Sequence, residues 1–479
     1  MTERTKILLL ALAFLVPAAA TRFAKLDWGF SGDETTEFTS IRTLFEEPFF
    51  EREMNSSNRG PRAHPVAYLI QAAAHRVFGK SEAGARTGVA AAGTLAIVLA
   101  VALIYHIYGL PTAVIAGILL ILAPWHLSHS QTNRNYSYAF LFASLAMLMA
   151  MIAWRDNSFR WAAAAAVCSA LAVASHNLTL VIPLALAGYT VVSRFLFKDP
   201  WPGRAVKGYA AFGVPLLSVT LVLMVIAMRG WGEIGSGYSS AHTLAALASN
   251  MVWGIALLAG VGWVWVWRDR RPEDMILAAI VLTAMLEAAI VPSLASFRHD
   301  YVFPVSLAFI LLASRALAAV YAYLKPHSRL LGAGIVIAAV LLPIPSFVSH
   351  YADGNKKDYR GAARYISQHW RDGDIVAADS NGLLAFYLKR DVLPVRRPGF
   401  SGKQCIEELQ KLRSSGKRVW FVCRYAREEP DTGVDQWMWR NAVRHLRLKR
   451  QRIDFYQNIV DVYLLNEGAG TPDVAVAAQ

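Results

Sequence analysis

Charged residues are scarce in this chain of 479 residues. They make up 17% of it, against about a quarter in typical soluble proteins, while 55% of the residues are hydrophobic and the mean hydropathy is +0.34. The shortage is concentrated in apolar runs of about 20 residues, each long enough to cross a bilayer core of about 30 Å as a helix. These features exclude an ordinary soluble fold and predict a polytopic membrane protein.

Several catalytic and binding motifs are also missing. The sequence has no Walker sequence and no His-Glu-x-x-His. Glycines between 230 and 237 match the dinucleotide-binding spacing, but no predicted strand precedes them, so we expect a mobile loop over a cleft. The one Asp-x-Asp, Asp372-Gly373-Asp374, lies at a predicted turn. A metal-dependent nucleotide-sugar site is therefore unsupported, and no residue is predicted to bind metal.

Cysteine is rare as well. Cys168 lies in an apolar run, whereas Cys405 and Cys423 lie in the C-terminal region. If that region faces an oxidising compartment, the last two are the pair able to form a disulfide. Whether they pair is left open.

Positive charge is abundant and unevenly distributed. The formal net charge is +14, and with a cytoplasmic N-terminus thirteen Lys and Arg residues fall in cytoplasmic segments, against three in the short opposite loops. This bias sets the orientation of a membrane protein. The charge therefore concerns topology and anionic lipid, and we do not expect a nucleic-acid partner.

The apolar runs predict about eleven spans. They cover residues 6–25, 82–107, 110–127, 136–154, 159–175, 179–197, 207–228, 243–267, 272–294, 299–324 and 329–350. Residues 7–20 resemble a signal peptide, but the apolar character continues to Phe23 and further spans follow. We therefore expect an uncleaved first span.

The long loop between the first two spans, residues 27–82, contains helical signals. Ser31 followed by Glu34 fits a capping box, and Phe38 and Ile41 recur at helical spacing. A second apolar face follows Pro65, formed by Val66, Leu69, Ile70, Ala73 and Val77 and ended by Gly79. We predict two short helices on the outer membrane surface.

The composition changes near Tyr351. Residues 358–370 and 405–412 predict helices, residues 374–379 and 418–424 predict strands, and residues 452–456 and 459–465 predict a terminal pair of strands. We expect domains at 1–350 (membrane) and 351–467 (a small external α/β domain), and a flexible tail at 468–479.

Adjacent carboxylates follow the first span at Asp33 and Glu34. One interpretation is structural, because Glu34 completes the capping box and Asp33 favours a helix N-terminus. The other is catalytic, because a positioned carboxylate can take a proton from a hydroxyl. The surrounding cations favour the catalytic interpretation for Asp33, while Glu34 suits either.

Cations gather on the external side of the predicted topology. They are Arg62, His64, Arg86, Arg134, His176 and Arg298. Each alone suits snorkelling or pairing with a carboxylate. Together they suit a phosphate or diphosphate, which Arg binds bidentately and His can hydrogen-bond. Glu287 lies inside a predicted span, where it either pairs in helix packing or serves a functional cavity.

These residues resemble the motifs of the GT-C membrane glycosyltransferases, in the branch of protein O-mannosyltransferases and lipid A aminoarabinose transferases. Gly32-Asp33-Glu34 resembles the acidic pair after the first span, and the segment from Arg62 to Leu69 resembles the Pro-rich second surface helix. The Glu82 to Arg86 segment fits as well. The likeness covers residues 1 to 325, in order.

Three further elements resemble motifs of the same family. Asn133-Arg134-Asn135-Tyr136 is similar to the Ala-Arg-x-Tyr element, and Ala174-Ser175-His176 is similar to the Thr-His element. Arg298-His299-Asp300-Tyr301 departs from the Arg-Tyr element by two inserted residues.

The resemblance implies inverting transfer of a sugar from a polyprenyl-phosphate donor to a hydroxyl of an envelope lipid, glycan or protein. Asp33 would act as general base, with Glu34 beside it, and the cations and Tyr136 would bind the donor phosphate. It implies a bacterial inner-membrane enzyme with a periplasmic active site and no required cofactor, although a divalent cation stays open. The sugar and acceptor are undetermined.

Two other classes fit the sequence less well. A transporter or flippase of lipid-linked saccharides would spread polar residues through its spans, whereas here only Glu287 lies deep. An O-antigen-ligase-like transferase would carry its large functional loop late among the spans, whereas here the large loop comes first.

Overall fold

The computed structural model describes residues 1–43, 64–198, 201–228, 239–293, 299–352, 357–395, 402–423, 433–450 and 458–466. Arg62, Arg298, the glycine-containing loop and the predicted tail lie outside these residues. The chain divides into two compact units. The membrane unit comprises Met1–Leu26 and Glu37–Val348, and the C-terminal unit comprises Asp27–Thr36 and Ser349–Gln479.

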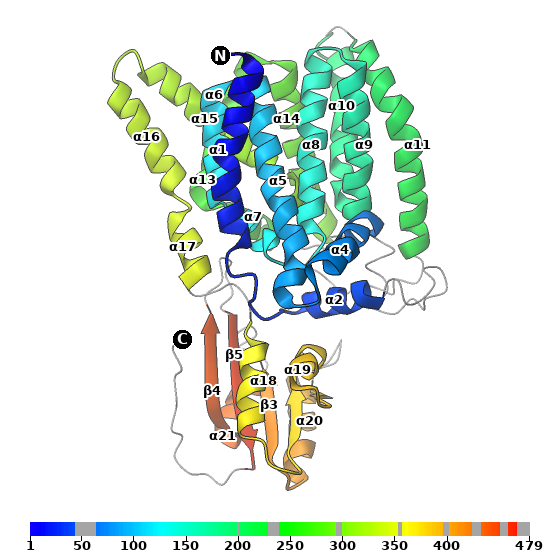
Figure 1. Ribbon diagram of the computed structural model, residues 1–479, viewed down its shortest axis with the longest axis vertical. Helices are drawn as coiled ribbons and strands as arrows, with labels where there is room; N and C mark the ends of the chain where they lie inside the picture. Colours follow the sequence, from blue (N-terminus) through cyan, green and yellow to red (C-terminus); the bar gives the residue numbers. More distant parts are fainter. Residues whose placement is uncertain are drawn as a thin grey trace. The chain divides into compact units, whose positions relative to one another are not determined.

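The membrane unit is a helical bundle (Figure 1). It begins with α1 (Glu3–Phe23), α2 (Asp33–Thr43), of which residues from Glu37 belong here, and α4 (Pro65–Phe78). The helices that follow are α5 (Glu82–Tyr108), α6 (Leu110–Leu122), α7 (Pro124–Ser130), α8 (Tyr136–Arg155), α9 (Phe159–Ser175), η1 (Asn177–Leu180), α10 (Val181–Phe195), α11 (Gly203–Met228), α12 (Ser240–Asn250), α13 (Trp253–Asp269), α14 (Pro272–Ile290), η2 (Val291–Ser293), η3 (His299–Val305), α15 (Ser306–Leu324), α16 (Arg329–Leu341) and α17 (Ile344–Ala352), of which residues up to Val348 belong here.

These helices make the chain a multi-pass membrane protein. Among the described residues, seven helices are long and apolar enough to cross a membrane, and nine if each of two bent pairs counts as one span. Every one of the eleven predicted spans coincides with a helix or a pair of helices. Two of these eleven spans are not among the nine: α9 is apolar but only 17 residues long, and α14 carries Glu273, Asp274 and Glu287.

Two predicted spans are broken rather than continuous. α6 and α7 meet at 60° beside Pro124, and α12 and α13 meet at 99°. Proline explains the first break, because it lacks the N–H that continues a helix. The second occurs at Val252, whose φ of 62° is rare for a β-branched residue. Asn250 and Gly254, both weak helix formers, flank this break, and the predicted span over 243–267 consists of two helices.

A buried arginine ties α1 to the break between α6 and α7. Arg22 is fully buried, and its guanidinium donates to the carbonyls of Leu120 (2.7 Å) and Ile121 (2.9 Å) and lies 2.9 Å from Nδ1 of His126. These carbonyls end α6 and would otherwise lack partners. Gln131, directly after α7, donates in the opposite direction, from Nε2 to carbonyls at the end of α1.

A cluster of ion pairs joins α5, α13, α14 and α15. The carboxylate of Asp274, fully buried, accepts from Tyr108 Oη (2.7 Å) and from Arg315 Nη2 (2.9 Å). Arg315 also lies 3.6 Å from Asp269 and over the ring of Tyr108. A buried carboxylate requires such partners.

α4 has an apolar face that is exposed, as predicted for a helix on a membrane surface. Leu69, Ile70 and Val77 are exposed, whereas Tyr68, Gln71, Ala72 and His75 are buried. Ile41 of α2 packs on Tyr68 and Ala72, and Phe38 lies against His75. A soluble helix would bury the apolar face, so this inversion suits contact with lipid.

The C-terminal unit contains a five-stranded mixed sheet in the order β2-β1-β3-β5-β4. Its elements are α18 (Tyr359–Gln368), β1 (Ile375–Ala378), α19 (Asn381–Leu388), β2 (Leu393–Pro394), α20 (Gly402–Ser414), β3 (Val419–Cys423), α21 (Val434–Asn441), β4 (Val443–Arg450) and β5 (Asn458–Leu465). β1 is parallel to β2 and β3, while β5 is antiparallel to β3 and β4.

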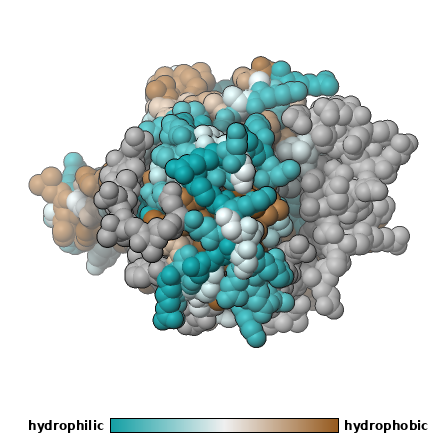
Figure 2. Space-filling model, turned by 90° about the horizontal axis from the view of Figure 1, so that it is seen from below, coloured by the Kyte–Doolittle hydropathy of each residue, from teal (hydrophilic) through white to brown (hydrophobic). Residues whose placement is uncertain are grey.

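The strands and α20 form a small hydrophobic core that includes Leu409, Val419, Phe421 and Tyr463. Arg447 of β4 lies opposite Asp461 of β5 and donates two hydrogen bonds of 2.7 Å to its carboxylate. The described residues that face the viewer in Figure 2, which looks from below, are mostly hydrophilic.

One strand was predicted in the wrong place. The partner of β5 lies at Val443–Arg450, whereas residues 452–456 fall outside the described residues. The alternation Val443, Leu446, Leu448 was obscured by a β-bulge at residue 445 and by the basic residues between the apolar ones. The short elements α19, β2 and α21 were not predicted at all. All three cysteines are free.

Candidate active site

The loop from α7 to α8 carries Arg134 and is fixed on both sides. Asn133 accepts a 3.2 Å hydrogen bond from Gln71 Nε2 of α4, and Asn135 donates through Nδ2 to the carbonyl of Ser175 (2.7 Å) at the end of α9. Both asparagines are buried. The Asn-Arg-Asn sequence thus holds the arginine between two anchors.

Arg134 lies beside an acidic partner. Its Nε donates to Oε1 of Glu37 at 3.0 Å, and its guanidinium carbon lies 5.2 Å from the centre of the Tyr136 ring. The Glu37 side chain is 9% exposed and that of Arg134 is 24% exposed. This hydrogen bond uses one of the five N–H donors that a guanidinium carries.

Two predicted histidines stack beside this pair. The rings of His64 and His176 are 5.4 Å apart and nearly parallel, and Tyr136 and Tyr301 lie 5.2 and 5.5 Å from His176. His176 lies between α9 and η1. Burial holds its pKa well below the usual range, and the nearby His64 and Arg134 lower it further. At neutral pH it is therefore an uncharged hydrogen-bonding group.

η3 adds a second carboxylate to the cluster. Oδ1 of Asp300 lies 3.6 Å from Nε2 of His129 and 3.4 Å from Nε2 of His299. The His129 ring in turn lies 4.6 Å from that of Tyr136. Among the described residues, no three His, Cys, Asp or Glu side chains are arranged to hold a metal ion.

The structure thus brings together His64, Arg134, Tyr136 and His176 from the predicted set. Arg86 is fully buried in α5 and donates from Nη1 to the carbonyl of Leu26 at 2.9 Å. This bond joins α5 to the segment after α1. Glu287 of α14 is half-buried, and its carboxylate makes no hydrogen bond or ion pair with the other described residues.

The acidic pair begins α2 within the C-terminal unit. Glu34 is buried, and its Oε2 accepts from the backbone N (3.0 Å) and from Oγ (3.1 Å) of Ser31; the first of these bonds is one half of the predicted capping box. Gly32 has φ +42°, a conformation that a side chain would strain. Asp33 is the first residue of the helix; its side chain lies outside the described part of the structure.

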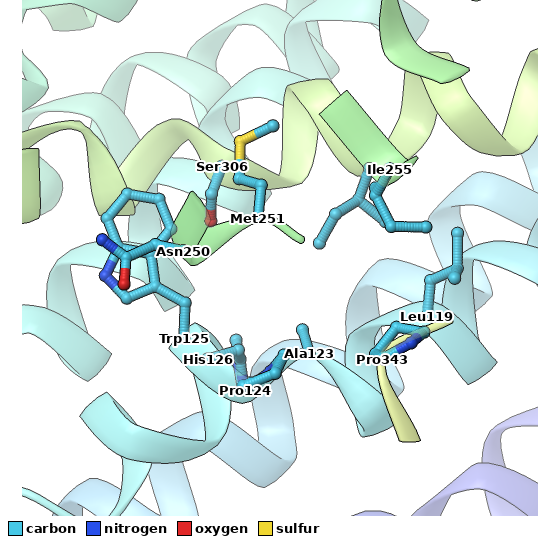
Figure 3. Close-up of a pocket in the computed structure, with 11 residues that line it drawn as sticks. Leu119, Ala123, Pro124, Trp125, His126, Asn250, Met251, Ile255, Ser306 and Pro343 are labelled. Atoms are coloured by element: carbon cyan, nitrogen blue, oxygen red, sulfur yellow. The ribbon is translucent and has the colours of Figure 1, made fainter. Parts of the chain in front are cut away.

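A pocket adjoins the cluster but is too small for a sugar (Figure 3). Its volume is about 20 Å³, and its lining comes from the two helix breaks and from α15 and Pro343. A space of this size holds a water molecule. Trp125, at one end, contacts Phe303 (5.3 Å between ring centres) and His129.

Four residues of the cluster were missed by sequence analysis. Glu37, His129 and Asp300 were not singled out, and Tyr301 was considered only as part of a motif. Glu37 lies 97 residues from Arg134, so only the fold reveals the pair. His129 in the Trp-His-Leu-Ser-His segment was the one available signal, because polar residues are unusual in an apolar run.

Comparisons with known proteins agree with the fold. A family model described as dolichyl-phosphate-mannose-protein mannosyltransferase matches residues 60–219. The structure resembles that of ArnT from Cupriavidus metallidurans, in the apo state with a TM-score of 0.55 and bound to undecaprenyl phosphate with 0.52. Identity is 16%, and each alignment covers 96% of this chain and 98% of ArnT. The fold of the chain is therefore of the GT-C type, as in these structures.

Two other structures extend this likeness. The oligosaccharyltransferase of Archaeoglobus fulgidus, tethered to an acceptor peptide, gives a TM-score of 0.53 at 14% identity over 86% of this GT-C chain and 68% of its own. The same enzyme was also solved with Zn and sulfate, with a TM-score of 0.52.

Arabinofuranosyltransferase AftD from Mycobacteria matches 98% of this GT-C chain with 40% of its own, at a TM-score of 0.53 and 14% identity. A search of curated protein sequences gave no match.

Proposed function

We propose that this GT-C protein is an inverting glycosyltransferase. It moves a sugar from a polyprenyl-phosphate donor to a hydroxyl of an envelope lipid, glycan or protein. The observation that carries the proposal is the cluster of Arg134, His64, His176 and Tyr136 in a fold shared with glycosyltransferases.

The cluster provides what a leaving phosphate requires. Negative charge develops on the phosphate oxygen as the sugar departs, and preorganised donors stabilise that charge most when water is excluded. Arg134 supplies a permanent positive charge, and Glu37 orients it. An uncharged His176 supplies hydrogen bonding without adding a second full charge. Arg62 and Arg298 are further candidates for the same phosphate.

Asp33 is the proposed general base. As the acceptor hydroxyl attacks the anomeric carbon, a new C–O bond forms, the bond from that carbon to the phosphate oxygen breaks, and the hydroxyl proton passes to Asp33. Polyprenyl phosphate leaves with the bonding electron pair. One displacement of this kind inverts the anomeric configuration. Glu34 supports the first turn of α2 through its cap, and Glu287 is a reserve candidate for the base.

The reaction as proposed needs no cofactor, because the donor is already activated by its phosphate. A divalent cation stays an option, since the archaeal oligosaccharyltransferase was solved with Zn. Chelation with EDTA separates the two cases: a cation-independent enzyme keeps its rate, and a dependent one loses it and regains it with Mg²⁺ or Mn²⁺.

We place the protein in the bacterial inner membrane, with a cytoplasmic N-terminus and with the site and C-terminal unit on the periplasmic side. The basis is the distribution of Lys and Arg. Single cysteines at positions 60 and 470, in a chain without its native cysteines, should react with a membrane-impermeant maleimide in whole cells. Labelling only after the membrane is opened contradicts this orientation.

The central experiment measures transfer directly. Purified protein in detergent is given a panel of radiolabelled polyprenyl-phosphate sugars with lipid, glycan and protein fractions of the envelope as acceptors. Labelled product should form with one donor, and polyprenyl phosphate should accumulate in equal amount. Mass spectrometry of envelope glycans with and without the gene identifies the sugar and the acceptor.

One observation favours a flippase as the alternative. The breaks at α6–α7 and α12–α13 are of a kind that transporters use to form binding sites. A flippase moves intact donor across a vesicle bilayer without cleaving it. Movement of intact donor with no release of polyprenyl phosphate would therefore replace the transferase proposal.

A further inference from the structure

The segment that leads into the acidic pair is held by the C-terminal unit. Phe30 is 1% exposed; its backbone N–H donates to Oη of Tyr387, and its ring lies 5.9 Å from that of Phe386. Both partners are neighbours on α19. One short helix therefore holds the backbone and the side chain of Phe30 together.

The two residues before Phe30 are held as well. A Cβ on Gly29 would lie 3.1 Å from Cβ of Arg360 and 3.4 Å from Oη of Tyr387, so the backbone is close against α18 and α19. The ring of Trp28 lies 5.5 Å from that of His350. Three consecutive residues thus contact the C-terminal part of the chain.

The fixed segment connects almost directly to Asp33. Only Ser31 and Gly32 intervene, and Ser31 is bonded to Glu34 by the capping box. The contacts that hold Phe30 therefore also constrain the position of the Asp33 backbone. A base must lie within hydrogen-bond reach of its proton, and a misplacement of about 1 Å can cost about a hundredfold in rate.

We propose that Tyr387 and Phe386 are positioning residues for Asp33, and that the C-terminal unit is part of the catalytic apparatus for this reason. The inference rests on the proposed function, in which Asp33 is the base. It assigns to α19, a helix that carries none of the family's motifs, a defined role in transfer and none in holding the lipid donor.

The test compares matched variants of the full-length purified protein. Tyr387→Phe removes one hydroxyl from the anchor, and Gly29→Ala crowds it at an unstrained φ. Tyr463→Phe is the control, because it removes a hydroxyl from a buried tyrosine elsewhere in the same unit, which donates to Asp461 at 3.3 Å. For each we measure kcat, the KM for donor, binding of undecaprenyl phosphate, Tm, and hydrogen exchange of the 27–36 peptide.

Tyr387→Phe and Gly29→Ala should lower kcat about tenfold with unchanged KM and phosphate binding. Exchange of the 27–36 peptide should be about tenfold faster. Tyr463→Phe should leave kcat and this exchange unchanged, whatever its Tm.

If hydrogen exchange of the 27–36 peptide is unchanged in Tyr387→Phe, Tyr387 does not hold this segment. Faster exchange with an unchanged kcat would overturn the positioning role. If Asp33→Asn instead transfers at the wild-type rate, the proposed base is wrong, and the exchange data still decide separately whether Tyr387 holds the segment.

Discussion

At the scale of single residues, the cluster is defined by a partly buried charge pair. Arg134 could bind a phosphate as an isolated cation, but it would then sample many rotamers. Glu37 restricts it through a charge-assisted hydrogen bond, which is stronger than a neutral one. The acidic partner lowers the net charge of the site while improving its geometry.

Arg134→Ala should lower kcat/KM for the donor about a hundredfold or more, because it removes charge stabilisation of the leaving phosphate. Arg134→Lys should lose less, since it keeps the charge without the bidentate fork. Glu37→Gln should lose about tenfold, because the neutral amide orients the guanidinium less well. Initial rates over a range of donor concentrations give the answer. Wild-type kinetics in both Arg134 variants would make this residue a membrane-surface anchor.

Asp33→Asn should reduce transfer about 10²–10⁴-fold, because an amide cannot accept the proton. Glu34→Gln should lose much less, since glutamine also completes a capping box. Donor binding and Tm should stay near wild type in both. The opposite pattern, with mild losses that follow Tm, would mean that the pair only caps α2.

At the scale of elements, α4 links the membrane surface to the Arg134 loop. Its exposed apolar face suits lipid, and its buried face carries Gln71 and His75 toward Asn133. Burial lowers the pKa of His75, with a hydrogen bond to Asn133 partly opposing this effect. The buried side of α4 therefore favours the neutral form of His75.

Stability should depend on the pH through this residue. With a folded pKa below the usual 6.5, the unfolded chain binds the proton more readily, so the contribution is complete above about pH 6.5 and is lost as the pH falls toward the folded pKa. The Tm should fall between pH 7.5 and 5.5, and His75→Gln should flatten that slope. An equal slope in both proteins would exclude His75 as its source.

The elements were largely predictable because apolar runs, Pro65, Gly79 and the Ser31–Glu34 box are local signals. The break at Val252 was not predicted, because Asn250 and Gly254 beside it are weak signals that also occur inside continuous helices. The site was predictable where one motif carries the chemistry, as in Arg134 and His176. Glu37, Asp300 and the grouping of residues 27–36 with the C-terminal unit depend on contacts between distant segments, which local patterns do not encode.

At the scale of the whole molecule, the membrane unit has buried ion pairs among its helices. Arg315 and Asp274 are the central pair, with Tyr108 and Asp269 beside them. The carboxylate of Asp274 thereby links α14 to α5 through Tyr108 and to α15 through Arg315.

Asp274→Ala should destabilise the protein by about 3–5 kcal/mol, because it leaves Arg315 without its buried partner. The double variant Asp274→Leu with Arg315→Met should recover much of that loss, since an apolar pair needs no compensation. Asp156→Asn, at an exposed pair with Arg155, should change little. Thermal unfolding in one detergent compares all three. A double variant as unstable as Asp274→Ala would mean that packing, not charge, is lost.

The buried position of Arg22 has a consequence for biogenesis. Its acceptors on α6 lie 98 and 99 residues further along the chain. A ribosome adds about 5–20 residues per second, so α1 leaves the ribosome some 5–20 s before those carbonyls exist. Until then the guanidinium must stay hydrated or be met by the insertion machinery, because an arginine is costly in lipid. The first helix therefore settles into its final depth only when the third span arrives.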